Sequence, residues 1–67
     1  MQEFKDRLKQ LRIDGGLTQK QVCNELKFSP NGYASYEQGR TQPNLETLTR
    51  LAKFFDVTTD YLLGLED

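Results

Sequence analysis

The sequence predicts an all-α protein built from five helices. Apolar residues recur at helical spacing in several segments, and each segment begins at a residue that can cap a helix or ends at glycine. No stretch shows the regular alternation of apolar and polar residues that is typical of a β-strand. Because 67 residues provide only one small core, residues 1–67 are expected to form a single domain.

The first helix is expected near residues 2–14. Phe4, Leu8 and Leu11 recur at intervals of four and three residues, which marks one apolar face. Gly15-Gly16 follows, and glycine adopts the left-handed conformation at the end of a helix without steric cost. The helix is therefore expected to end there.

The second helix is expected to begin after Thr18. Gln21 lies three residues further on, so the two side chains can form a capping box. Val22 and Leu26 give this helix its buried side. Cys23 lies where a small residue would let two helices approach closely, and the alternative is a reactive thiol.

The third helix is expected to begin at Ser29-Pro30 and to run to about Gln38. Serine caps the helix, and proline is favoured at the first position because its missing N–H would have no partner there in any case. Tyr33 and Tyr36 are expected to face inward. Gly39 ends the helix.

A fourth and a fifth helix complete the expected fold. Asn44 caps the fourth helix, whose apolar stripe comprises Leu45, Leu48, Leu51, Ala52 and Phe55. Asp56-Val57 interrupts it. Thr58 caps a last short helix, which carries Tyr61, Leu62 and Leu65.

The second and third helices, joined by a short turn within TQKQVCNELKFSPNGYASYEQGRTQP, predict a helix-turn-helix motif that binds DNA. The N-terminal residues of the second helix of such a motif contact base edges in the major groove. Asn31 can pair with adenine through its amide, and Ser35 is a less selective reader. Gly32 either lets the backbone of the third helix approach the groove closely, or it has no role in binding and the flexibility that it adds is tolerated.

Phosphate contacts are expected on both sides of this helix. Gln19 and Lys20 lie at the start of the second helix, where free N–H groups and the helix dipole attract anions. Arg40, Thr41 and the cap region at Asn44 would contact the backbone beyond the third helix. The alternative for these residues is a solvated polar surface.

Composition narrows the function further. A single cysteine and the absence of histidine leave too few ligands for a zinc site, and no cofactor, metal or small-molecule ligand is expected. No apolar stretch is long enough to span a membrane and no signal peptide is evident, so a cytoplasmic location is expected. The chain lacks a pairing of nucleophile and base and a glycine-rich phosphate loop, which argues against an enzyme.

The formal net charge of −1 is unusual for a protein that binds nucleic acid. The charge is unevenly distributed, however: residues 1–53 carry nine Lys and Arg against six Asp and Glu, whereas residues 54–67 carry four acidic residues and no basic one. The basic excess is small, so DNA affinity should be salt-sensitive but depend on few ionic contacts.

The segments LKQLR, GLTQKQV, YEQGR, LETL, LAK and DYLLG, at this spacing, resemble the phage-repressor and Cro-type helix-turn-helix family, also called XRE-type regulators, from about Phe4 to Gly64. The resemblance implies a five-helix lambda-repressor-like domain from a prokaryote or phage. It also implies that Thr18 and Gln19 grip the DNA backbone. The positions that it assigns to recognition are Ser29, Pro30, Asn31, Gly32 and Ser35.

The resemblance further implies a structural ion pair between Arg12 and Glu37, the alternative being two solvated side chains. Two positions depart from the family pattern. Lys27 stands where the turn usually carries glycine, so it either adopts a strained conformation or reaches a phosphate. Pro30 stands where many relatives have a polar side chain that reads a base. Part of the specificity is therefore expected to come from DNA shape or from contacts of paired subunits.

The sequence therefore predicts a repressor-like transcription regulator that binds double-stranded DNA, as a homodimer on a palindromic operator. Tyr61, Leu62 and Leu65 are the expected dimer surface, although Tyr61 and Leu62 could equally pack on the fourth helix. The alternative function is a protein-binding module, such as an antitoxin or an anti-repressor-like partner, on the same scaffold.

Overall fold

The computed structural model describes residues 3–66, and its regular structure within that range is entirely helical. The helices are α1 (Phe4–Asp14), α2 (Gln19–Leu26), α3 (Pro30–Gln38), α4 (Leu45–Phe54) and α5 (Thr59–Leu62). The prediction of an all-α fold with five helices is confirmed. The start of the first helix had been expected near residue 2, which lies outside the described residues.

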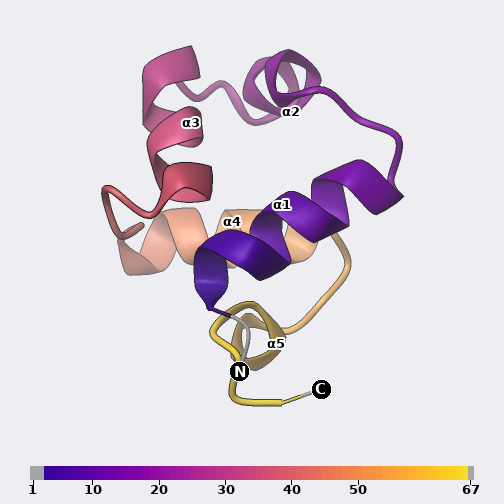
Figure 1. Cartoon of the computed structure of the whole chain (residues 1–67), viewed down its shortest axis with the longest axis vertical. Coiled ribbons are helices and arrows are strands. Elements are labelled where there is room, and N and C mark those ends of the chain that lie inside the picture. Colours follow the sequence, from indigo (N-terminus) through magenta and orange to yellow (C-terminus); the bar gives the residue numbers. More distant parts are fainter. Residues whose placement is uncertain (1–2, 67) are drawn as a thin grey trace.

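The helices surround a single core. α2 and α3 lie together at one end of the molecule, α1 crosses its middle in front of α4, and α5 lies at the opposite end (Figure 1). α1 packs against both α3 and α5, whereas α2 packs against α3 and α4 against α5. None of the helices within residues 3–66 has the length and apolar character required to cross a membrane.

The predicted caps form as the sequence indicates. The Thr18 hydroxyl accepts a hydrogen bond from the Gln21 backbone N–H (3.1 Å), and the Gln21 side chain accepts one from the Thr18 N–H (2.7 Å), which completes the capping box. The side chains of Ser29, Asn44 and Thr58 cap the three later helices in the same way. Local hydrogen bonds therefore set where four of the five helices begin.

The core consists of buried side chains from all five helices. Its members are Leu8, Val22, Cys23, Leu26, Tyr33, Leu48, Leu51, Ala52 and Leu62. The prediction that Leu45 belongs to the buried stripe of α4 is wrong, since 83% of its surface is exposed. Leu45 is the first residue of α4, where the exposed loop joins the helix and the core does not cover it.

Two non-glycine residues adopt the left-handed backbone conformation at the ends of helices. Lys27 (φ 58°, ψ 39°) follows α2, and its N–H donates to the carbonyl of Cys23. Asp56 (φ 56°) follows α4. The sequence had indicated such strain at Lys27, where the expected glycine is missing, and the backbone confirms it.

Replacing Lys27 by glycine should stabilise the protein. Relief of the left-handed conformation gains about 1–2 kcal/mol, and glycine loses about 0.5–1 kcal/mol more conformational entropy than other residues on folding. We therefore expect Lys27→Gly to raise the free energy of unfolding by about 0.5–1 kcal/mol, as measured by urea denaturation. Lys9→Gly, in the middle of α1, is the control and should lose about 1 kcal/mol. Equal losses in both variants would contradict the assignment of strain to Lys27.

Candidate nucleic-acid interface

Cys23 makes two contacts with the turn between α2 and α3. Its carbonyl accepts the N–H of Phe28 (3.0 Å), and its thiol contacts the carbonyl of Ser29 at 3.9 Å. The side chain is 3% exposed, and burial, followed by the nearby Glu37 carboxylate, raises the pKa of the Cys23 thiol. A buried, protonated thiol fits the packing role and not the reactive one.

Three helices meet at the carboxylate of Glu37. Arg12 on α1 donates to it through Nε (2.7 Å to Oε2) and Nη2 (3.1 Å to Oε1), and Gln19 on α2 donates to Oε1 at 3.1 Å. Arg12 also donates through Nη1 to the carbonyl of Leu17, just before α2, at 2.9 Å. The structure thus brings Arg12 and Glu37 together and adds Gln19 as a third partner.

The protonation state of this cluster follows from its contacts. Only 2% of the Glu37 side chain is exposed. Burial acts to raise the pKa of Glu37, but the hydrogen bond from Arg12, and then the contacts from Tyr33 and Gln19, outweigh it and lower the pKa overall. The hydrogen bond with Glu37 raises the pKa of Arg12, and burial, with Glu37 beside it, raises that of Tyr33. The ion pair therefore stays charged at neutral pH.

The first turn of α3 is organised by Ser29. Its hydroxyl accepts the N–H of Gly32 at 3.1 Å, and a Cβ added at Gly32 would lie only 2.7 Å from that oxygen. A side chain at position 32 would therefore require the Ser29 hydroxyl to shift, a local constraint that the sequence did not reveal. Pro30 occupies the first helical position, and Asn31 is exposed beside it.

Ser35 and Arg40 contact one another at the other end of α3. The Ser35 hydroxyl donates to the carbonyl of Asn31 (2.8 Å) and accepts from Nη2 of Arg40 (3.3 Å). Ser35, a predicted base reader, and Arg40, a predicted phosphate ligand, thus form one unit. Asn31 and Ser35 lie one helical turn apart on the same face of α3.

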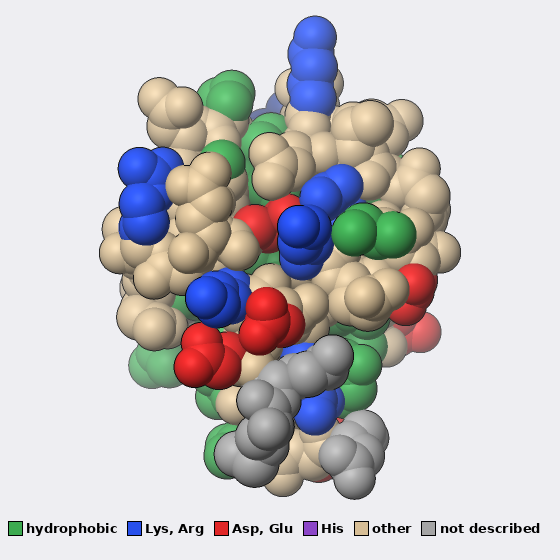
Figure 2. Space-filling model, viewed as in Figure 1, with side chains coloured by type: hydrophobic (Ala, Val, Ile, Leu, Met, Phe, Trp, Pro, Cys, Tyr) green, Lys and Arg blue, Asp and Glu red, His purple; other side chains and the backbone are tan. Residues whose placement is uncertain are grey.

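The other predicted phosphate ligands differ in how available their side chains are. Lys20, Lys27 and Thr41 are exposed, whereas the polar groups of Thr18 and Asn44 already cap α2 and α4. Figure 2, in which α1 faces the viewer, shows Lys and Arg side chains as separate projections with acidic side chains near the start of α1. The exposed basic side chains of the motif are few, so it can supply only a few ionic contacts with DNA.

Two arginines that the sequence did not single out donate to backbone carbonyls far away in the chain. Arg50 on α4 donates to the carbonyl of Leu26, the last residue of α2, and its guanidinium lies 4.8 Å from the centre of the Phe28 ring. Arg7 on α1 donates to the carbonyl of Glu66 (2.8 Å) and lies 4.4 Å from the centre of the Tyr61 ring. Both contacts join residues far apart in the sequence, so no local pattern could have indicated them.

The residues expected to form a dimer surface have different environments. Leu62 has no exposed surface and belongs to the core, so the prediction that it faces a partner does not hold for the folded chain. Tyr61 is partly buried beside Arg7. Leu65 is 71% exposed, and its neighbour Leu63 is 44% exposed.

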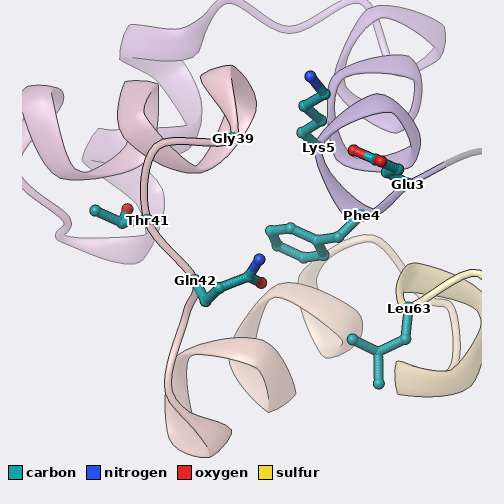
Figure 3. Close-up of a pocket in the computed structure, with 7 residues that line it drawn as sticks. All are labelled: Glu3, Phe4, Lys5, Gly39, Thr41, Gln42 and Leu63. Carbon is teal, nitrogen blue, oxygen red and sulfur yellow. The ribbon is translucent and has the colours of Figure 1, made fainter.

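An open cavity of about 520 Å³ lies between the start of α1, the loop after α3 and the end of α5. In Figure 3 the ring of Phe4 faces the side chain of Gln42 across it, with Leu63 on one side and Lys5 extending toward Gly39 on the other. Glu3 and Thr41 complete the lining. None of the candidate base-reading residues borders this cavity.

Comparisons with known proteins agree with this geometry. A family model described as "Helix-turn-helix" matches residues 8–62. The chain is 42% identical over 65 residues to the HTH-type transcriptional activator BcrR of Enterococcus faecalis, covering 97% of this chain and 32% of that protein. It is 39% identical over 54 residues to the cryptic phage CTXphi transcriptional repressor RstR of Vibrio cholerae, covering 81% of this chain and 49% of that protein.

A solved structure shows the same fold. The crystal structure of a transcriptional regulator from Listeria innocua superposes with a TM-score of 0.86 at 32% identity, over 97% of this chain and 61% of that one. The chain thus spans half or less of the length of the two curated relatives above and under two thirds of this structural neighbour.

Glu37→Gln should destabilise the protein and change how its stability depends on pH. We expect a loss of about 1.5–3 kcal/mol at neutral pH, the range for hydrogen bonds to charged groups. Because the folded-state pKa of Glu37 is lowered, its stabilisation is complete above the unfolded carboxyl pKa of about 4.3. It is lost as the pH falls through the folded-state value.

Urea denaturation between acidic and neutral pH measures this effect. The difference between wild type and Glu37→Gln should shrink steadily toward acidic pH. Glu25→Gln, at an exposed position of α2, is the matched control and should change stability by less than about 0.5 kcal/mol throughout. A constant difference across the pH range would rule out the charge of Glu37 as the source of stabilisation.

Proposed function

The chain belongs to the XRE-type helix-turn-helix family, and from this we propose that it is a sequence-specific transcription regulator that binds double-stranded DNA in the cytoplasm. α3 would enter the major groove, and α2 would lie across the DNA backbone. Asn31 would read base edges from the first turn of α3, while Gln19, Lys20 and Thr41 would lie nearest the phosphates.

One observation carries the proposal: the exposed polar face of α3 is held rigidly relative to α1 and α2. Glu37, on the buried side of α3, receives hydrogen bonds from Arg12 and Gln19. A side chain can discriminate between bases only if the backbone that carries it has a defined position. This arrangement supports a reading function for α3 beyond a purely structural one.

The electrostatics also favour DNA at this face more than the net charge suggests. Glu37, the acidic residue of α3, is buried and paired with Arg12, so its negative charge is offset within the protein. Lys20, Lys27 and Arg40 lie on exposed parts of the motif. Docking depends on the local field at the phosphates, and these three residues would contribute positive charge to it.

The chain would act as a homodimer, because one copy presents few base readers and few basic residues. Two copies related by a two-fold axis would place their recognition helices about 34 Å apart and select a palindromic operator. Leu65, with 71% of its surface exposed, would be central to the contact, and the accessible edge of Tyr61 would lie beside it. Leu62 is not part of this proposal.

The direction of regulation does not follow from the domain. BcrR is named an activator and RstR a repressor, yet both match this chain over most of its length. A repressor-like role for this chain therefore rests on where its operator lies relative to a promoter.

Selection of bound duplexes from a random DNA pool tests the proposed function. We expect wild type to enrich a palindromic motif with half-sites one helical turn apart, and Asn31→Ala to lose about 1–3 kcal/mol of discrimination at one base pair of each half-site. Asn24→Ala, at an exposed position of α2, is the matched control and should leave the motif unchanged. If nothing is enriched at low salt, the DNA-binding proposal fails and a protein-binding module, antitoxin or anti-repressor-like, becomes the better explanation.

The dimer proposal has a separate test. Leu65→Ser should weaken self-association in sedimentation equilibrium and reduce affinity for the full operator more than for an isolated half-site. Leu45→Ser is the matched control, because Leu45 is equally apolar and even more exposed but lies at the start of α4. Equal effects of the two substitutions would contradict an interface centred on Leu65.

A further inference from the structure

Arg40 is attached to the recognition helix at two points. Its backbone N–H donates to the carbonyl of Ser35 at 3.0 Å, and its guanidinium Nη2 donates to the hydroxyl of Ser35 at 3.3 Å. Gly39 makes this arrangement accessible, because its left-handed conformation (φ 77°) turns the chain back at the end of α3. Arg40 therefore lies along α3 although it follows it in the sequence.

Both the hydrogen and the oxygen of the Ser35 hydroxyl take part in hydrogen bonds within the protein. Its single hydrogen is donated to the carbonyl of Asn31 (2.8 Å), and its oxygen accepts from Arg40. In this state Ser35 offers no free donor to a base. Its hydroxyl instead holds the guanidinium of Arg40 beside position 35, which lies one helical turn from Asn31.

The guanidinium of Arg40 still has N–H donors that could contact a base. Within residues 3–66 no carboxylate forms a salt bridge with Arg40, and Glu37, three residues earlier, is engaged by Arg12. One N–H contacts Ser35, and the other donors of the planar fork are available. Guanine presents two acceptors, O6 and N7, in the major groove, and arginine is their most frequent partner.

We propose that Arg40 reads guanine in the major groove and that Ser35 is its positioning residue. This inference rests on the proposed function and reverses the roles that the sequence suggested, in which Ser35 reads a base and Arg40 contacts a phosphate. Each half-site then contains an adenine contacted by Asn31 and a guanine contacted by Arg40.

The experiment measures affinity for the selected operator and for duplexes changed at each base pair in turn, at several salt concentrations. Arg40→Gln should reduce discrimination at one guanine position by about tenfold or more, the value of one bidentate contact. Arg40→Lys keeps the charge without the fork, so it should lose the same discrimination while the dependence of affinity on salt stays unchanged. Ser35→Ala should weaken discrimination at that same base pair.

Lys20→Gln is the matched control, because Lys20 is an exposed basic residue at the start of α2. It should lower affinity for all duplexes equally and flatten the salt dependence by about one phosphate contact. If Arg40→Gln behaves like this control, Arg40 is a phosphate ligand and the inference is overturned. If Ser35→Ala affects a different base pair, the positioning role of Ser35 is refuted.

The two levels of the proposal fail in different ways. If wild type selects no motif, the proposed function fails and the inference with it. If wild type selects a motif that contains no position sensitive to Arg40, only the assignment of Arg40 fails. Circular dichroism of each variant, compared with wild type, shows that a change in affinity does not come from unfolding.

Discussion

The buried carboxylate of Glu37 is the constraint on which the arrangement of this molecule depends. α1 and α2 both direct a donor at it, from Arg12 and Gln19, so the relative positions of three helices are set by one side chain. A buried ion pair adds little net stability, because desolvation offsets much of the attraction. Its value lies in selecting one arrangement, since any other would leave a charge buried without its partner.

Several arginine side chains likewise connect separate parts of the structure. Arg12, Arg7 and Arg50 each donate to a backbone carbonyl, at Leu17, Glu66 and Leu26 respectively. The first two carbonyls lie outside the helices and the third at the end of α2, where a carbonyl has no partner within its helix and must be satisfied in another way. Three of the nine basic residues therefore serve the fold, and this use of arginine explains why a helix-turn-helix protein has so little basic charge to offer to DNA.

The sequence predicted what local chemistry determines. Caps at Thr18, Ser29, Asn44 and Thr58 follow from side-chain hydrogen bonds that span three residues, and periodicity identified nearly all of the core. The failures have physical causes as well: periodicity alone placed Leu45 inside although the helix begins there, and it could not show that Leu62 is covered completely. The contacts of Arg50 and Arg7 depend on tertiary approach, and the link between Ser35 and Arg40 depends on the turn at Gly39.

The close approach of the Ser29 hydroxyl to Gly32 has a consequence for protein engineering. A side chain at position 32 would meet the Ser29 hydroxyl that caps α3, so that oxygen must shift when Gly32 is replaced. Asn31 carries no such restriction, because its side chain is exposed and is not used in a cap. A library intended to retarget the protein to a new operator should therefore randomise position 31 freely and vary position 32 together with position 29.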